Sequence, residues 1–598
     1  MLQLTAEDQA KSWLARLGAA LDARDTPGIL ALFRTDALWR DLLCFTWSIA
    51  TFDGPSEIGA MLDRCLAQAA PHAIAIEPGT GKDTDGTIEA WFTFETATLR
   101  GRGHLRLQDG QCRTLFTAGF AIIGHEERTG RLRERGVEHG AQRGRLSWPE
   151  RRAAREAALG TTGQPYCLII GGSQGGLSLA ARLNRLEVPT LVIDALARPG
   201  DAWRRRYRSL HLHDPIWACH LPYMPFPGHW PVFIAKDRVG DWLEAYAEMM
   251  EIAFWGSTVM QGAQYDDAEQ CWTVTVERDG HPVTLRPKQL VLATGMSGAP
   301  AMPRFPGAET FRGTQCHSSA FTSGAAYAGR RAVVIGSNNS AHDICADLWE
   351  HGAEVTMVQR SSTLVARAET LSRFVTSKLF SEDAIAAGIT TEQADYMAAS
   401  RPYAMVQDLH RALYRDIRAH DAAFYERLEK AGFLLDFGED DTGLSMKYLR
   451  RASGYYIDVG ASELVANGDI ALRSGVQVAR LRPDGVELFD GSVLAADLIV
   501  YATGYDPMES WIAQLISPEV AERVGHVWGL GSNTRRDPGP WVGELRAMWK
   551  PTRQPGLWLQ GGNLQQVRFY SRILALQIQA RMLGIETPVF DPKGLAEH

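Results

Sequence analysis

The sequence predicts an α/β protein with two strand–glycine turn–helix–strand units, preceded by a small α+β domain. Residues 167–195, CLIIGGSQGGLSLAARLNRLEVPTLVIDA, form the first unit. Residues 330–360, RRAVVIGSNNSAHDICADLWEHGAEVTMVQR, repeat the same order of elements. Before both, residues 6–123 show helical periodicity followed by strand-like alternation.

Composition limits the classes of partner. A chain of 598 residues is too long for one hydrophobic core, so we expect several domains. The net charge of −8 gives no overall attraction to nucleic acid or to an anionic membrane, and we expect neither as a partner. No run of apolar residues is long enough for a spanning helix, and the N-terminus lacks a signal-peptide pattern.

Eight scattered cysteines contain no C-x-x-C pair and no zinc-ligand spacing, so we expect no metal site. They are typical of buried thiols in a reducing compartment, and we expect a cytoplasmic protein. A flavin disulfide reductase would need a redox-active cysteine pair near a glycine turn, and the spacings exclude one.

The N-terminal region combines apolar residues at helical spacing in residues 6–24 and the helical run GILALF with the strand-like runs IEAWFTFETATL, GHLRLQD and CRTLFTAGFAII. Together with the stretch ALFRTDALWRDLL, this pattern resembles the SnoaL-like, cone-shaped α+β domains, and it predicts such a domain over residues 1–123. In that family the fold serves as an enzyme pocket, a binding module or a dimerisation unit, so a homodimer is one expectation. Residues 124–163 are rich in arginine without interleaved aromatic residues and predict a solvated helical linker.

The turn GGSQGG in the first unit approaches the dinucleotide fingerprint G-x-G-x-x-G. Glycine occupies positions 171 and 176, and serine stands at 173, where the fingerprint has its middle glycine. Asp194 ends the next strand roughly 20 residues on, where a carboxylate can accept hydrogen bonds from ribose hydroxyls. The helix N-terminus offers backbone N–H groups to a pyrophosphate. This unit therefore predicts a Rossmann-like domain for FAD over residues 164–328.

The turn GSNNSA in the second unit has Gly336 first and Asn338 in the middle position. Its second strand ends in Arg360 and Ser361 rather than in a carboxylate. An arginine at this place suits the 2′-phosphate of NADPH, although a plain surface arginine is the alternative. We assign residues 329–496 to an NADPH domain that contains a helical insertion at about 365–450. The insertion either roofs a substrate pocket or packs as ordinary core.

Two strands that end in Ala-Thr-Gly flank the second unit, LVLATGMSGAP with Thr294 and Gly295, and LIVYATGY at 498–505. They predict the two points where the chain leaves the first domain and returns to it, so that residues 497–598 complete the FAD domain.

The segment FRGTQCHSSAF, residues 311–321, fits the signature F-x-G-x-x-x-H-x-x-x-[FY] of flavin-containing monooxygenases. With the two fingerprints and the two Ala-Thr-Gly turns in order, residues 164–598 resemble that family, in particular its plant indole-pyruvate (YUCCA) group. The related Baeyer–Villiger enzymes usually end the signature in tryptophan, where this chain has Phe321. The resemblance implies FAD and NADPH as cofactors. It also implies transfer of one oxygen atom from O2 to a small organic substrate by way of a flavin hydroperoxide, as N- or S-oxygenation or as oxidative decarboxylation of a 2-oxo acid.

The resemblance also implies roles for single residues. The FAD-contacting set is Gly171, Ser173, Gly176, Asp194, Thr294, Gly295, Trp203, Arg206, Gly562 and Asn563, the last two from LWLQGGNLQQVRFYS. The NADPH set is Gly336, Asn338, Arg360 and Ser361. The catalytic candidates are His317 in the signature and His213, which lies in the HLHDP segment where many members have an asparagine. Three alternatives stay open: a Baeyer–Villiger enzyme, an NADPH oxidase on the same scaffold, and a nucleotide-sensing binding protein.

Overall fold

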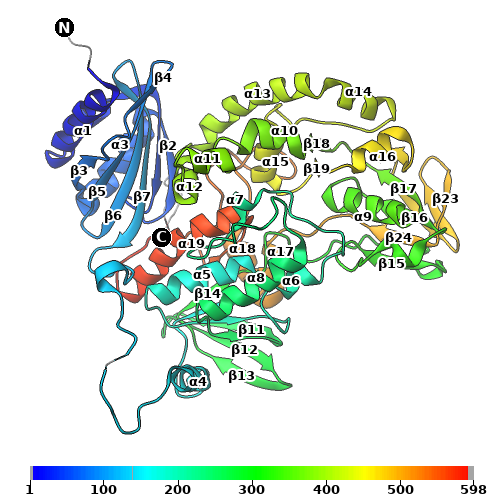
Figure 1. Cartoon of the computed structure of the whole chain (residues 1–598), viewed down its shortest axis with the longest axis horizontal. Coiled ribbons are helices and arrows are strands. Elements are labelled where there is room, and N and C mark those ends of the chain that lie inside the picture. Colours follow the sequence, from blue (N-terminus) through cyan, green and yellow to red (C-terminus); the bar gives the residue numbers. More distant parts are fainter. Residues whose placement is uncertain (1–3, 138, 590–598) are drawn as a thin grey trace.

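The computed structural model describes residues 4–137 and 139–589 (Figure 1). In the N-terminal domain, three helices cover one face of a seven-stranded sheet: α1 (Ala6–Asp22), α2 (Thr26–Leu30) and α3 (Gly54–Ala69). The strands in spatial order are β2 (Ile49–Asp53), β1 (Phe33–Leu42), β7 (Gln111–Ile122), β6 (Leu99–Gln108), β5 (Thr87–Glu95) and β3 (His72–Ile76), with β4 (Lys82–Thr84) paired to β5. Only β1 and β7 pair in parallel. The predicted order of helices and strands is therefore present, while a SnoaL-like origin stays a prediction.

Helix α1 shows why this domain forms a core of its own. Thr5 and Asp8 make a reciprocal capping box that fixes its start. Trp13, Leu14 and Leu17 then fall on one face and pack with the inner face of the sheet. The space inside the curved sheet is filled by this core.

Residues 124–163 form the connecting segment and contain one 3-10 turn (Gly130–Leu132) and helix α4 (Trp148–Ala158). Helix α4 has no buried residue. Its Trp148 and Arg152 bond to Glu251 and Glu248 at the end of α8. The segment is exposed and partly helical, and its assignment as a linker stays a prediction.

The first Rossmann-like domain has a five-stranded parallel sheet in the order β10 (Phe254–Trp255), β9 (Thr190–Ile193), β8 (Cys167–Ile170), β14 (Gln289–Leu292), β25 (Leu557–Leu559). Helices α5 (Gln174–Arg185) and α19 (Leu564–Met582) pack together beside it, and α6 (Asp201–Arg204), α7 (Ile216–Cys219) and α8 (Lys236–Met249) follow β9 along the chain. Strands β11 (Thr258–Asp266), β12 (Cys271–Arg278) and β13 (His281–Leu285) form a separate antiparallel sheet. Strand β25 arrives from the C-terminal region, as the second Ala-Thr-Gly turn predicts.

The second Rossmann-like domain has a parallel sheet in the order β15 (Thr314–His317), β24 (Leu498–Tyr501), β16 (Arg331–Ile335), β17 (Glu354–Gln359), β20 (Ala471–Ser474). Helices α9 (Asn339–Glu350) and α16 (Ala461–Asn467) contact each other beside it, and β21 (Val478–Arg482), β22 (Gly485–Leu488) and β23 (Val493–Ala495) form a small antiparallel sheet. The sheet extends past the predicted limits of 329 and 496 on both sides. The reason is that β24 hydrogen-bonds between β15 and β16, so both flanking strands belong to this domain.

The helical insertion lies between the N-terminal domain and the second Rossmann-like domain along the top of Figure 1. Its elements are β18 (Leu364–Arg367), α10 (Ala368–Leu371), a π-helical turn (Ser372–Thr376), α11 (Glu382–Ala386), α12 (Thr391–Ala399), α13 (Tyr403–His420), α14 (Ala422–Lys430), α15 (Gly443–Arg451) and β19 (Tyr455–Asp458). Helices α17 (Glu509–Leu515) and α18 (Pro518–Val524) belong to the returning segment. Among the described helices, none has the length and apolar character that a bilayer span requires.

Candidate active site

The predicted FAD-contacting residues gather at one edge of the first sheet. Residues 171–176 follow β8, Asp194 follows β9, Thr294 and Gly295 follow β14, and Gly562 and Asn563 follow β25. These four strands are neighbours and run parallel, so all four turns open at their carboxyl ends. Ligands of doubly wound sheets bind at this edge.

The glycine turn is closed so tightly that it leaves no room for side chains at two positions. A Cβ atom on Gly176 would lie 1.9 Å from the Gly171 carbonyl oxygen, and one on Gly171, at φ 113°, would lie 2.5 Å from the Ala293 carbonyl oxygen. These two glycines let α5 start directly against β8 and β14. The helix N-terminus is thereby held at the sheet edge, where its N–H groups can bind a pyrophosphate.

Ser173 is the N-cap residue of α5, but its hydroxyl does not cap the helix. Its Oγ donates to Gln174 Oε1 at 2.6 Å, and Trp203 Nε1 donates to the same oxygen at 3.0 Å. The serine therefore takes part in a local network with the predicted flavin-side residue Trp203. Its backbone remains extended, with φ −101°, so the serine fits the turn without strain.

Asp194 holds the turn from the next strand. Its carboxylate accepts hydrogen bonds from the backbone N–H groups of Gly172, at 2.6 Å, and Leu196, at 2.7 Å. Burial raises the pKa of this carboxyl, and the two backbone hydrogen bonds oppose the shift. Each oxygen keeps a lone pair for a further donor such as a ribose hydroxyl.

Two further polar atoms among the predicted FAD contacts are buried and lack a hydrogen-bond partner within the part of the chain that the structure describes. They are Thr294 Oγ1 and Arg206 Nε. Such atoms normally have a partner, because an unpaired buried polar group is costly. Together with the tight glycine turn, the unpartnered Thr294 Oγ1 just after β14 fits a bound dinucleotide at this edge.

The second glycine turn has the same construction. A Cβ atom on Gly336, at φ 134°, would lie 2.3 Å from the Ala502 carbonyl oxygen, and Asn338 is the N-cap of α9. Ser337 and Thr363 exchange a hydrogen bond of 2.8 Å that closes the turn. Arg360 and Ser361 follow β17, and Arg360 is exposed and has no hydrogen bond or ion pair to any described residue. Its guanidinium group is thus available to a phosphate.

His317, predicted as a catalytic residue, ends β15 and is buried. Its Nδ1 lies 3.2 Å from the donating N–H of Ser319, so the ring proton is on Nε2, which donates to the Gly504 carbonyl oxygen at 3.0 Å. Burial lowers the pKa of this imidazole, so the neutral form predominates at neutral pH. The geometry makes His317 a residue that positions the second Ala-Thr-Gly turn. A direct role in proton transfer stays a prediction.

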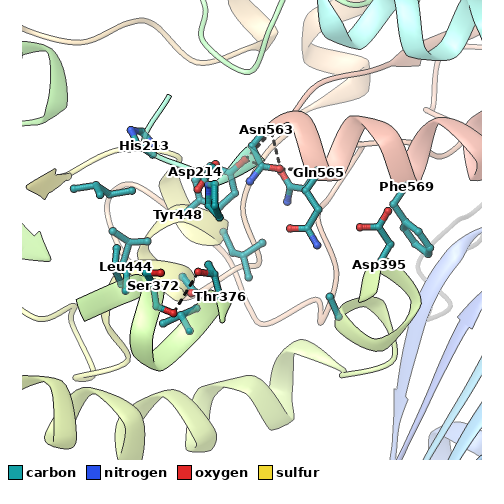
Figure 2. Close-up of a pocket in the computed structure, with 18 of the residues that line it drawn as sticks. His213, Asp214, Ser372, Thr376, Asp395, Leu444, Tyr448, Asn563, Gln565 and Phe569 are labelled. Atoms are coloured by element: carbon teal, nitrogen blue, oxygen red, sulfur yellow. Dashed lines mark hydrogen bonds between the residues drawn. The ribbon is translucent and has the colours of Figure 1, made fainter. Parts of the chain in front are cut away.

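A cavity of about 390 Å³ lies between the first domain and the helical insertion (Figure 2). His213 and Asp214 line it from the loop after α6, and Asn563 lines it from the start of α19. The insertion lines it through α10, the π-helical turn, α12, α13, α15 and β19. The insertion therefore borders this cavity, while other side chains of it, such as Tyr414 and Leu428, are packed in hydrophobic clusters. That it roofs a substrate pocket stays a prediction.

Asn563 is fixed where α19 meets this cavity. Its side chain accepts from the N–H of Gln566 at 2.9 Å, and Tyr448 donates to Gln566 Oε1 at 2.6 Å from helix α15. The predicted flavin contact at the start of α19 is thus tied to the insertion. Sequence reasoning missed Tyr448, because nothing in its surroundings marks it as more than a helix residue.

Other lining residues carry no sequence signal. The N-terminal domain contributes Arg40 from β1, and α19 contributes Phe569 and Tyr570. His410, on α13, has a buried Nδ1 with no partner among the described residues. In the described part of the chain, no group of His, Cys, Asp and Glu side chains is arranged to hold a metal ion.

Comparison with known proteins places the chain in a family. Residues 168–394 match the family model described as pyridine nucleotide-disulphide oxidoreductase. The probable indole-3-pyruvate monooxygenase YUCCA7 of Arabidopsis thaliana is 30% identical over 356 residues, which cover 58% of this chain and 76% of the relative. The chain belongs to the flavin monooxygenase family. It is an FAD-dependent oxidoreductase that uses NADPH.

Two further similarities agree with the assignment of this chain to the flavin monooxygenase family. The indole-3-pyruvate monooxygenase YUCCA1 of Oryza sativa subsp. japonica is 31% identical over 353 residues, covering 58% of this chain and 79% of the relative. A crystal structure of cyclohexanone monooxygenase in an open form superposes with a TM-score of 0.51 at 18% identity, over 70% of this chain and 87% of that one. At 18% identity, the similarity to cyclohexanone monooxygenase shows a shared fold and nothing more.

Proposed function

We propose that this monooxygenase inserts one oxygen atom from O2 into a small, largely apolar molecule held in the cavity beneath the helical insertion. The observation that carries the proposal is the position of the cavity. It is bordered by His213, a predicted catalytic residue, and by Asn563, a predicted flavin contact, and most of its lining is apolar or aromatic. A volume of about 390 Å³ is in the range of small-molecule sites.

Bound FAD supplies the redox chemistry, because it takes hydride from NADPH and passes electrons to O2. The chain has to keep water away from the reacting atoms, and the buried side chains of Leu449, Ile457 and Phe569 on the cavity wall serve this purpose. His317 holds the turn at Gly504, next to the predicted NADPH loop at Gly336, and so contributes to the position of the nicotinamide. No nucleophilic side chain is required.

We propose an aromatic 2-oxo acid as the first substrate class, followed by apolar amines and sulfides. The plant relatives named as indole-3-pyruvate monooxygenases favour the first class. We propose that His410, one of the polar residues that line the cavity, orients such a molecule, since its Nδ1 has no partner among the described residues. Burial, aided by the charge of Arg401, lowers the pKa of His410 to about 4, so it acts as a neutral hydrogen-bonding group.

The test is purification of the whole chain, followed by an absorbance spectrum and assays of NADPH, O2 and hydrogen peroxide. Indole-3-pyruvate, phenylpyruvate, methyl phenyl sulfide, N,N-dimethylbenzylamine and cyclohexanone serve as probes. We expect bound FAD and, with at least one probe, about one oxygenated product per NADPH. Release of nearly all electrons as hydrogen peroxide with every probe would favour an NADPH oxidase, and cyclohexanone as the best substrate would favour a Baeyer–Villiger enzyme. A protein that binds neither FAD nor NADPH would contradict the proposal.

We further propose a cytoplasmic location and a role for the N-terminal domain in assembly as a homodimer. All eight cysteines are free thiols, as expected in a reducing compartment. A SnoaL-like domain is one fold that forms dimers in its relatives, and light scattering of the purified protein measures the mass directly. A mass of 66 kDa would contradict the dimer.

A further inference from the structure

The N-terminal domain is built into the monooxygenase rather than attached by a linker alone. The outer face of its sheet packs against α19, and β7 lies next to this helix. Leu42, Phe116 and Ala118 from the sheet belong to the same buried hydrophobic cluster as Leu574 and Ile578 of α19. Apolar burial of this kind makes a stable, fixed junction. Figure 1 shows the blue strands directly beside α12 and α19.

One charged residue of this sheet face reaches the cavity. Arg40, on β1, is 1% exposed and lines the cavity wall. Its Nε and Nη2 donate to the two carboxylate oxygens of Glu544, at 2.6 and 2.8 Å, in a bidentate pair. Glu544 is 2% exposed and also accepts from Thr51 Oγ1 at 2.7 Å. The ion pair is therefore buried and fully formed between two domains.

The remaining bonds of Arg40 go to the cavity wall itself. Its Nη1 donates to the carbonyl oxygen of Ala399, the last residue of α12, at 2.5 Å. Its Nη2 donates to Tyr570 Oη of α19 at 3.0 Å, and its guanidinium carbon lies 4.9 Å from the ring centre of Tyr403, the first residue of α13. All three partners line the cavity. One side chain thus holds three wall elements in a single arrangement.

A second arginine strengthens the same junction. Arg106, on β6, donates to the Ser400 carbonyl oxygen at 3.1 Å and to Ser400 Oγ at 3.0 Å. Ser400 directly follows Ala399, so the turn between α12 and α13 is held at two successive residues. In Figure 2, Asp395 and Phe569 lie at the end of the cavity next to the blue strands, whereas His213 and Ser372 lie at the opposite end.

Removing an arginine and a glutamate from water costs free energy. Their attraction offsets this cost only when every donor and acceptor of the pair is well placed. Such a network favours one arrangement of the groups around it over others. We expect the pair to fix the positions of its neighbours more than to add net stability. The groups that it positions form the cavity wall farthest from His213.

We infer that the N-terminal domain completes one wall of the substrate cavity through Arg40, and that Arg40 positions this wall and so sets which substrates fit. Arg40 acts through Ala399, Tyr403 and Tyr570, so it is a positioning residue. The inference rests on the proposed function, because it takes the cavity to be the substrate site. It gives the extra domain a role in selecting the substrate, in addition to any role in assembly.

The test compares Arg40→Lys with the wild-type enzyme, using the best of the five probes. Lysine keeps the positive charge but cannot make the bidentate pair together with the bonds to Ala399 and Tyr570. The control is Arg102→Lys. Arg102 lies at the same interface and pairs with Glu77 of its own domain, but it does not line the cavity. FAD content, the melting temperature, NADPH oxidation without probe, KM and kcat for the probe, and the hydrogen peroxide yield are measured for each.

For Arg40→Lys we expect wild-type FAD content and NADPH oxidation without probe, a rise of about tenfold or more in the KM of the probe, and a larger share of NADPH recovered as hydrogen peroxide. Arg102→Lys should change none of these by more than about twofold. A folded Arg40→Lys enzyme with wild-type KM and peroxide yield would overturn the inference. If the wild type itself neither binds FAD nor oxidises NADPH, the proposed function fails first.

A double variant, Arg40→Met with Glu544→Met, removes both charges of the pair together, so that neither remains buried without the other. We expect it to fold, since its side chains fill similar space. It should show the same rise in the KM of the probe and the same larger share of hydrogen peroxide as Arg40→Lys. Wild-type KM and coupling in the double variant would overturn the inference. Failure of both variants to fold would also overturn it, because Arg40 would then serve stability alone.

Discussion

The substitution Gly176→Ala tests whether the first glycine turn is the FAD site. The added Cβ atom would lie 1.9 Å from the Gly171 carbonyl oxygen and 3.2 Å from Ile169 Cγ2. Since Cβ contacts under 3.0 Å essentially never occur, α5 must move away from β8 by about 1 Å. The obstacle is backbone and cannot rotate aside.

Overpacking of this kind costs about 3 kcal/mol. The cost falls on the arrangement that presents the N–H groups of α5 to the pyrophosphate. Since each 1.4 kcal/mol is a factor of ten, the Kd for FAD should rise about 100-fold. The assay is titration of apoprotein with FAD, followed by flavin fluorescence, with a melting curve to verify that the variant is folded.

Gly175→Ala is the matched control. Gly175 is the neighbouring residue in α5, and a Cβ atom there has its nearest neighbour, Gln560 Cγ, at 3.6 Å, an ordinary contact. Gly175 lies in the first turn of α5, where alanine is the better helix former by up to about 1 kcal/mol. We expect this variant to bind FAD as the wild type does. A Gly176→Ala protein that keeps wild-type FAD affinity would refute the assignment of the turn.

Three further predictions concern single positions. Arg360→Ala should raise the KM for NADPH about 10- to 100-fold and leave that for NADH unchanged, since a charged hydrogen bond contributes about 1.5 to 3 kcal/mol; equal losses with both coenzymes would contradict the 2′-phosphate role. Ser173→Gly should retain FAD and Ser173→Leu should release it on gel filtration; retention by the leucine variant would show that the turn binds something else. Burial lowers the pKa of His342 to about 4 in the folded protein. The imidazole therefore takes up a proton when the protein unfolds, and the free energy of unfolding falls as the pH drops below about 6.5. Between pH 7 and 5, the wild type should lose about 2 kcal/mol more in urea unfolding than His342→Phe, and an equal loss would refute this origin.

Much of the architecture followed from local sequence patterns. A buried strand, a glycine turn and an amphipathic helix are properties of neighbouring residues, so both Rossmann-like units could be located from 167–195 and 330–360. The Ala-Thr-Gly turns located the crossings between the domains, because a tight turn after a strand also has a local signature. The domain limits at 328 and 496 could not be located in this way. Whether β15 and β24 belong to the second sheet depends on hydrogen bonds to β16, which no local pattern encodes.

The cavity was the part that only the tertiary structure decided. The predicted dinucleotide contacts are close to their motifs along the chain, and parallel strands bring their carboxyl ends to one edge by topology alone. The topology of a sheet does not determine which residues form the walls of the cavity. Arg40, Ala399, Glu544 and Tyr570 meet across hundreds of residues of sequence. Their contact exists because the outer face of the N-terminal sheet buries its apolar side chains against α19. The sequence thus determined the fold and the predicted sites for FAD and NADPH, whereas packing between domains decided the shape of the cavity proposed for the substrate.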